Sequence, residues 1–263
     1  MNGGERGVLD RDLLQWLARI APVALRVGGL LTFSPFLGDR AIPNRIKVGL
    51  LIVLTALLVP VTPVQPMLVT PFQWVQMILG EVLVGVLMAL SLAAVFEAFQ
   101  FAGQFAGIQL GLSLATLFDP QSNADSPALS VFFNLITLLI FLQLNIHHWI
   151  LRTLTRSFEY LPVGSVAPTE LMTREAVRMV GMLFVLGIQI AAPVLVATMM
   201  IDMVLGFVSK ASPQLPVLLF GLPIKNLTGY AILMAAMTMW PGMLERRFAM
   251  AIAAAEHMLH MAH

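Results

Sequence analysis

The chain has 263 residues, of which 59% are hydrophobic and 11% are charged, and its formal net charge is +1. A soluble domain is typically about 45–50% apolar and about 25% charged, so this composition excludes an ordinary water-soluble globular protein. The near-neutral charge gives no reason to expect nucleic acid as a partner. The absence of cysteine excludes disulfides, thiolate metal sites and cysteine nucleophiles.

Long uncharged stretches predict membrane-spanning helices, because crossing a bilayer takes roughly 20 apolar residues. Inside lipid, every backbone N–H and C=O group must also find its hydrogen-bond partner within the same segment, which favours a helix. We expect an all-α polytopic integral membrane protein with about six long hydrophobic helices, several of them broken by proline. In chain order these helices cover 13–37, 47–61, 72–118 (as one piece or two), 127–151, 178–206 and 216–244.

The segments between these helices are rich in proline, glycine and charged residues, which end helices and form turns. We find no long linker, no low-complexity tract and no repeat of fixed period. The first apolar run lacks a clear signal-peptide cleavage site. The sequence therefore predicts a single membrane-inserted domain over 1–263, with flexible termini at 1–12 and 248–263.

Two arginines and three acids inside the apolar segments need an explanation. Arg19 and Arg26 are seven residues apart and share a helix face, so we expect this face to meet protein or water. For Arg19, snorkelling from the helix start is an equally good explanation. Glu81, Glu97 and Asp202 could form a proton relay. However, Glu81 and Glu97 point about 160° apart on a helix, which favours packing or interface roles instead.

Gly103, Gly107 and Gly111 follow a G-x-x-x-G-x-x-x-G pattern, which allows another helix to approach closely. The pattern leads into a bulky apolar stretch and a turn, which suits either a movable constriction or an ordinary helix end. His147 and His148 are adjacent and make a poor metal pair. The sequence contains no phosphate-binding loop, dinucleotide fingerprint or nucleophile elbow. We therefore predict no enzyme activity, no metal and no cofactor.

Several stretches, in this order and spacing, resemble the FliR family of flagellar export-gate proteins and its counterparts in virulence-associated type III secretion. The resemblance covers about 13–244 and favours the flagellar branch. The stretches that carry it are Arg40-Ala41-Ile42-Pro43 with Lys47, Gly103 to Gly111, Ser113-Leu114-Ala115-Thr116 with Asp119-Pro120, Leu161-Pro162-Val163-Gly164, and Ala211-Ser212-Pro213-Gln214-Leu215 with Gly221-Leu222-Pro223.

The resemblance implies a structural and gating subunit of the flagellar type III protein export gate, in the bacterial inner (cytoplasmic) membrane at the flagellar basal body. Such a subunit assembles with P- and Q-type export-gate subunits, is joined by an FlhB-type switch protein, and lets unfolded flagellar proteins pass. The matching plug residues are Gln109, Leu114, Leu117, Phe118, Asp119 and Pro120. Relatives can carry Phe at the positions of Leu114 and Leu117, which gives Phe118 a share in sealing. The matching packing and assembly residues are Gly103, Gly107, Gly111, Arg40, Pro43, Lys47, Gln214 and Pro223.

Two other functions stay open at this point. A small-molecule or ion transporter could use the intramembrane acids Glu81, Glu97 and Asp202. Such a transporter should work when purified alone, whereas a gate subunit should need its partners. An intramembrane enzyme would require a convergent acid, base or nucleophile cluster, and the sequence offers none at a suggestive spacing.

Overall fold

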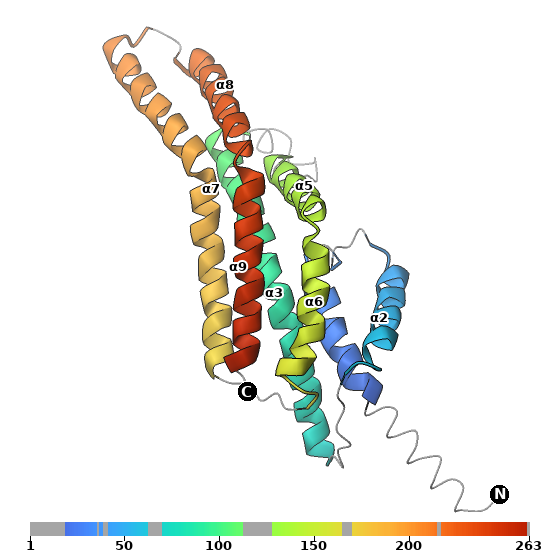
Figure 1. Ribbon diagram of the computed structural model, residues 1–263. Helices are drawn as coiled ribbons and strands as arrows, with labels where there is room; N and C mark the ends of the chain where they lie inside the picture. The colour runs from blue at the N-terminus through green and yellow to red at the C-terminus, as the bar shows by residue number, and fades with distance from the viewer. Residues whose placement is uncertain are drawn as a thin grey trace, which may run out of the picture. The chain divides into compact units, whose positions relative to one another are not determined.

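The computed structural model describes residues 19–35, 37–38, 42–62, 70–112, 128–164, 170–214 and 217–261. All regular structure in these ranges is helical, which confirms the all-α prediction. A first helix covers residues 19–33. The others are α2 (Asn44–Leu58), α3 (Pro71–Gln109), α5 (Ala128–Gln143), α6 (Ile146–Tyr160), α7 (Glu170–Ala211), α8 (Val217–Met237) and α9 (Trp240–Met261), as Figure 1 shows.

The longest apolar helix that the sequence predicted, over 72–118, is one helix of 39 residues, α3. Its start is a capping box. The backbone N–H of Thr70 donates to Gln73 Oε1 at 2.8 Å, and the N–H of Gln73 donates to Thr70 Oγ1 at 3.4 Å. Pro71 follows at the first helical position, where a missing N–H costs nothing. The helix ends nine residues before the predicted boundary.

Two of the described helices, α3 and the 173–211 part of α7, are long and apolar enough to cross a membrane on their own. The number rises to four if α5 with α6, and α8 with α9, each count as one span that is bent at a short break. The break between α5 and α6 falls at Asn145, which has a left-handed backbone with φ of 54°. These spans fit the predicted polytopic membrane protein.

The chain divides into two compact units. The first unit comprises 1–93, 145–179 and 249–263, and the second comprises 94–144 and 180–248. Helices α3, α7 and α9 each have one part in the first unit and another part in the second. The single domain that the sequence predicted stays a prediction.

The core of the first unit is formed by the helix over 19–33, α2, the N-terminal part of α3, α6 and the end of α9. Apolar side chains on the inner face of the first helix, Val23, Val27 and Leu30, are almost fully buried there. In the terminus predicted as flexible, residues 248–261 are helical. Met258 and Leu259 are buried in this unit, because apolar residues at helical spacing give α9 a face to bury.

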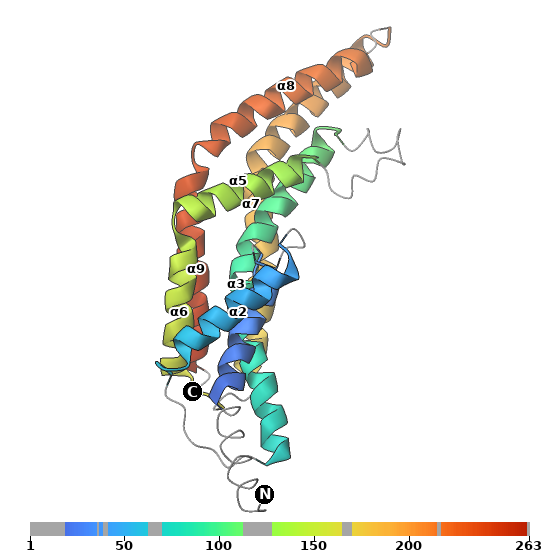
Figure 2. The same cartoon turned by 90° about the vertical axis from the view of Figure 1, so that its right-hand side faces the viewer.

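The core of the second unit is aromatic. Phe96, Phe141 and Phe248 form a triangle with ring centroids 5.4–5.6 Å apart. Trp240 contacts the rings of Phe99 and Phe133 at 5.5 and 4.7 Å. The second unit's part of α7 runs alongside the C-terminal part of α3 in both views (Figures 1 and 2), held by the ring contact of Phe101 with Phe184. These separate groups of rings join α3 to α5, α7 and α9.

Candidate functional site

A polar cluster in the second unit joins the end of α3 to α7 and α8. The ammonium group of Lys225 lies 2.7 Å from Asp202 Oδ2, and Gln109 Nε2 donates to the same oxygen at 3.3 Å. The Asp202 side chain is 47% exposed and that of Lys225 is 14% exposed. The structure therefore brings together Gln109, predicted as a plug residue, and Asp202, predicted as an intramembrane acid. Sequence reasoning did not connect Lys225 with either of them.

Directly after Gln109, α3 stops in a Schellman motif. The N–H of Leu112 donates to the carbonyl of Gly107 at 3.0 Å, and the N–H of Gly111 donates to that of Ile108 at 3.0 Å. Gly111 has φ of 76°, a left-handed conformation that glycine adopts without the penalty of a Cβ. Gly111 thus ends the helix, whereas its spacing with Gly103 and Gly107 had predicted a packing role.

The last turn of α3 is anchored by Leu110, which is fully buried. A Cβ at Gly229 in α8 would clash with its side chain, and Thr198 of α7 also borders this position. The side chain of Leu110 and the polar group of Gln109 therefore hold the end of α3 against both α7 and α8.

The start of α5 is held against the same stretch of α3. A Cβ at Gly103 would lie 2.7 Å from the Cα of Ser130 and 2.9 Å from the carbonyl oxygen of Leu129, so only glycine permits this approach. Residues 113–127, which lie outside the described residues, thus connect two fixed points on α3 and α5. We call the contacts of Gly103, Gln109, Leu110, Asp202 and Lys225 the loop frame.

The other predicted site residues lie as follows. Gly107 is buried on α3, Pro43 precedes the first residue of α2, and the Lys47 ammonium donates to the carbonyl of Gly38 at 2.9 Å. Gln214 is exposed in the turn after α7, and Pro223 lies inside α8. The remaining six positions lie outside the described residues: Leu114, Leu117, Phe118, Asp119, Pro120 and Arg40.

A second polar site, in the first unit, is a completely buried ion pair. Arg26 and Glu81 have no exposed surface, and Arg26 Nε donates to Glu81 Oε2 at 2.7 Å. This observation confirms that the helix face carrying Arg26 meets protein. Arg19 on the same helix is exposed and borders a groove of about 770 Å³ against α2.

All three guanidinium nitrogens of Arg26 donate hydrogen bonds. Nη1 donates to the carbonyl and hydroxyl oxygens of Ser157, at 2.9 and 3.2 Å, and Nη2 donates to the carbonyl of Leu161 at 3.0 Å. The ring of Phe158 lies 4.2 Å from the guanidinium carbon. On the other side, Glu81 Oε1 accepts the N–H of Gly164 at 3.0 Å. Both carboxylate oxygens of Glu81 are thus occupied inside the protein.

Two glycines allow the helices that carry this pair to touch. A Cβ at Gly85 would overlap the carbonyl oxygen of Arg26, and one at Gly29 would lie 2.9 Å from the carbonyl oxygen of Val82. The backbones of the first helix and α3 are therefore in direct contact one turn away from the ion pair. Neither glycine was singled out in the sequence, although small residues at such crossings are the usual signal.

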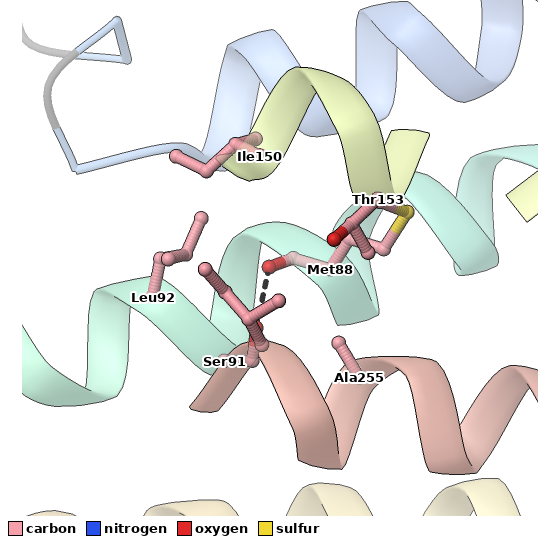
Figure 3. A pocket seen from close by; sticks show the side chains of 7 residues that line it. Met88, Ser91, Leu92, Ile150, Thr153 and Ala255 are labelled. Atoms are coloured by element: carbon pink, nitrogen blue, oxygen red, sulfur yellow. Dashed lines mark hydrogen bonds between the residues drawn. The ribbon is translucent and has the colours of Figure 1, made fainter. Parts of the chain in front are cut away.

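The first unit also contains a small cavity where α3, α6 and α9 meet (Figure 3). Its volume is about 10 Å³, room for one water at most, and Met88, Ser91, Leu92, Ile150, Thr153 and Ala255 are among the residues that line it. Ser91 Oγ donates to the carbonyl of Met88 at 2.7 Å, and Thr153 Oγ1 donates to Glu256 Oε1 at 3.2 Å. This cavity is too small to hold a transported solute. Among the described residues, no group of three or more His, Cys, Asp or Glu could hold a metal ion.

Comparison with known proteins decides the family. The model of the bacterial export proteins, family 1, matches residues 17–251. The chain belongs to this family. As a bacterial export protein it is a component of an export apparatus, and its long apolar helices fit a membrane-embedded protein. The family that the sequence motifs indicated is thereby confirmed.

Relatives of this export protein span nearly its full length. It is 29% identical over 237 residues to the flagellar biosynthetic protein FliR of Pectobacterium carotovorum, covering 90% of this chain and 91% of the relative. It is 28% identical over 230 residues to FliR of Escherichia coli K12, covering 88% of each. FliR of Aquifex aeolicus is 32% identical over 212 residues, 80% of this chain and 81% of the relative.

Proposed function

We propose that this export protein is a structural and gating subunit of the flagellar type III protein export gate. It assembles with P- and Q-type subunits and an FlhB-type switch protein in the bacterial inner membrane, and unfolded flagellar proteins pass through the assembly. Its similarity to FliR proteins over nearly the whole chain supports the flagellar assignment. In this proposal, the segment around 109–123 is the plug, with Leu114, Leu117 and Phe118 as its apolar sealing side chains.

The loop frame is the observation that supports the gating role in this proposal. A plug must be held at its base and still be displaced when substrate passes. Leu110 and Gly103 give residues 113–127 two fixed ends, while Gly111 supplies a backbone turn directly before them. An apolar constriction stops ions by excluding water, so bulky apolar residues on a loop held in this way are suited to sealing a channel.

The plug is tested with a variant in which Leu114, Leu117 and Phe118 are all replaced by Ser. In cells that express the full apparatus, we expect the membrane to become permeable to ions while the chain still assembles. Membrane potential is followed with a voltage-sensitive dye. The matched control replaces Val131, Leu135 and Leu139 by Ser, three exposed apolar residues of α5. An unchanged potential in the plug variant, with normal assembly, contradicts the sealing role.

Assembly is tested by co-purification of the tagged chain from gently solubilised native membranes. Recovery of stoichiometric P- and Q-type subunits supports the gate. A chain that purifies alone as a stable particle and carries out solute transport supports the transporter alternative. In that case Glu97 and Asp202 are the acids to mutate, because Glu81 is closed in by Arg26 and Gly164.

A further inference from the structure

The three acids inside the apolar helices have different surroundings. Glu81 is paired with Arg26, and Asp202 is paired with Lys225. Glu97 lies in the second unit's part of α3, is exposed, and has no ion pair or hydrogen bond within the part of the chain that the structure describes. It is also the only charged residue between Glu81 and Asp119. A carboxylate in the middle of such a helix is costly against lipid and needs a partner.

Two glutamines extend the polar character of this face. Gln100 and Gln104 follow Glu97 at positions i+3 and i+7, so the three side chains line one face of α3. Both glutamines are partly exposed, and neither has a hydrogen-bond partner among the described residues. We call Glu97, Gln100 and Gln104 the α3 polar stripe.

Large apolar side chains flank the stripe. Ile108, one turn beyond Gln104 on the same face, is 60% exposed, and Phe105 is 40% exposed. On the neighbouring α7, Phe184 contacts Phe101 of α3 and is itself 50% exposed. A narrow polar strip between bulky apolar side chains suits neither lipid nor a water-filled path. It matches a helix–helix interface in a membrane, where polar side chains hydrogen-bond across apolar surroundings.

We propose that the α3 polar stripe is the docking surface for a transmembrane helix of another export subunit, which places a Lys or Arg side chain against Glu97. This inference rests on the proposed function, because it requires a multi-subunit assembly. Charge complementarity sets the partner's chemistry. A cation matches the unpaired carboxylate, and polar groups one and two turns further along match the amides of Gln100 and Gln104. The apolar flanks then pack against the partner's aliphatic side chains and keep water away from the ion pair.

The charge is tested by replacing Glu97 with Gln, and separately with Leu, in the full chain expressed with its export apparatus. We expect both variants to reach the membrane at the normal level but to recover at least about tenfold less of one other export subunit, since a cation in the partner is left unpaired. Glu245→Gln is the matched control, because Glu245 is an exposed carboxylate on α9 of the same unit; its recovery should be normal.

The partner is identified by a photo-crosslinking amino acid at Gln104, activated in native membranes. We expect a crosslink to an apolar segment of another export protein that contains Lys or Arg. Changing that residue to Glu in the partner should restore recovery when combined with Glu97→Lys.

Three results would overturn the inference. The first is normal recovery with Glu97→Leu, which means that no cation faces Glu97. The second is a Gln104 probe that crosslinks only to lipid. The third is rapid labelling of Gln104→Cys by a water-soluble maleimide in the assembled complex, which places the stripe on a water-filled path; the chain has no other cysteine to confuse this test. If the unmodified chain recovers no export subunit at all, the proposed function fails, and the inference fails with it. If it recovers them and the variants do the same, only the inference fails.

Discussion

The two units each contain an ion pair between apolar helices, and the two pairs are built differently. In the first unit, Arg26 and Glu81 are completely buried, and every nitrogen of the guanidinium and both carboxylate oxygens have partners. In the second, Asp202 is 47% exposed and shares one oxygen between Lys225 and Gln109. A saturated buried pair is hard to open, because either partner alone is a buried charge. The Asp202–Lys225 pair is enclosed by fewer protein groups, so opening it breaks fewer contacts. The first therefore fixes helices in place, and the second can yield beside the proposed plug.

The largest effect is expected from Arg26→Met. It leaves the Glu81 carboxylate buried without its cation, and breaking a buried pair from one side costs about 3–5 kcal/mol. We expect the thermal unfolding temperature of the purified protein to fall sharply, together with its level in the membrane.

The double variant Arg26→Met with Glu81→Leu is the control for this prediction, since it removes both charges. It should lose less stability than Arg26→Met alone, because no charge is left buried. Equal losses in the two variants would mean that Arg26 acts through packing on Phe158, not through its charge.

The next effect concerns the helix contact beside this ion pair. In Gly85→Ala the new methyl group overlaps the carbonyl oxygen of Arg26, so the first helix and α3 must separate. Overpacking of this kind costs about 1–3 kcal/mol. Gly181→Ala on α7 is the matched control, because a Cβ there meets nothing within 4 Å; it should gain about 0.5–1 kcal/mol. Chemical denaturation of both variants checks this, and a neutral Gly85→Ala contradicts the close approach.

A smaller effect is expected in the second unit from Gly111→Ala, which places a Cβ on a left-handed backbone with φ of 76°. The expected cost is about 1–2 kcal/mol. Gly206→Ala on α7 has open space around its Cβ and serves as the reference. If thermal unfolding of Gly111→Ala matches that of Gly206→Ala, the α3 stop does not depend on the left-handed glycine.

The smallest effect is expected from Lys225→Met, because the pair that it breaks is partly exposed. A double-mutant cycle with Asp202→Asn should give a coupling energy of about 1 kcal/mol or less. The equivalent cycle on Arg26 and Glu81 should give several times more. Similar coupling in both units would remove the distinction between a fixed pair and a yielding one.

The sequence was a good guide to individual elements and to the surroundings of one buried charge. The start of α3 was predicted within one residue, because the proline-rich break before the helix ends at Pro71. The Thr70–Gln73 capping box was not singled out in the sequence. The end of α3 was placed nine residues late, because apolar composition continues past Gly111 and the stop depends on a backbone conformation. Arg26 was expected to face protein or water for a general reason, the cost of a charge in lipid, and it faces protein.

The sequence could not show which charged and polar side chains pair with one another. Glu81 is 55 residues from Arg26, and Ser157 is 131 residues away, so no local periodicity connects them. The acids were considered together as a possible relay, although packing roles were favoured; Glu81 lies in one unit and Asp202 in the other, each with its own cation. Of the predicted plug, the structure places Gln109 on Asp202, while Leu114, Leu117 and Phe118 lie outside the described residues.

The distance in sequence between Arg26 and its partners also determines how long Arg26 waits for them while the chain is being synthesised. A ribosome adds about 5–20 residues per second, so Glu81 follows Arg26 by roughly 3–11 s at those rates, and Ser157 by roughly 7–26 s. Until Glu81 is made, Arg26 has none of its native hydrogen-bond partners, and until Ser157 and Leu161 are made it lacks the rest. The helix over 19–33 therefore reaches its final surroundings only after α6 has been synthesised.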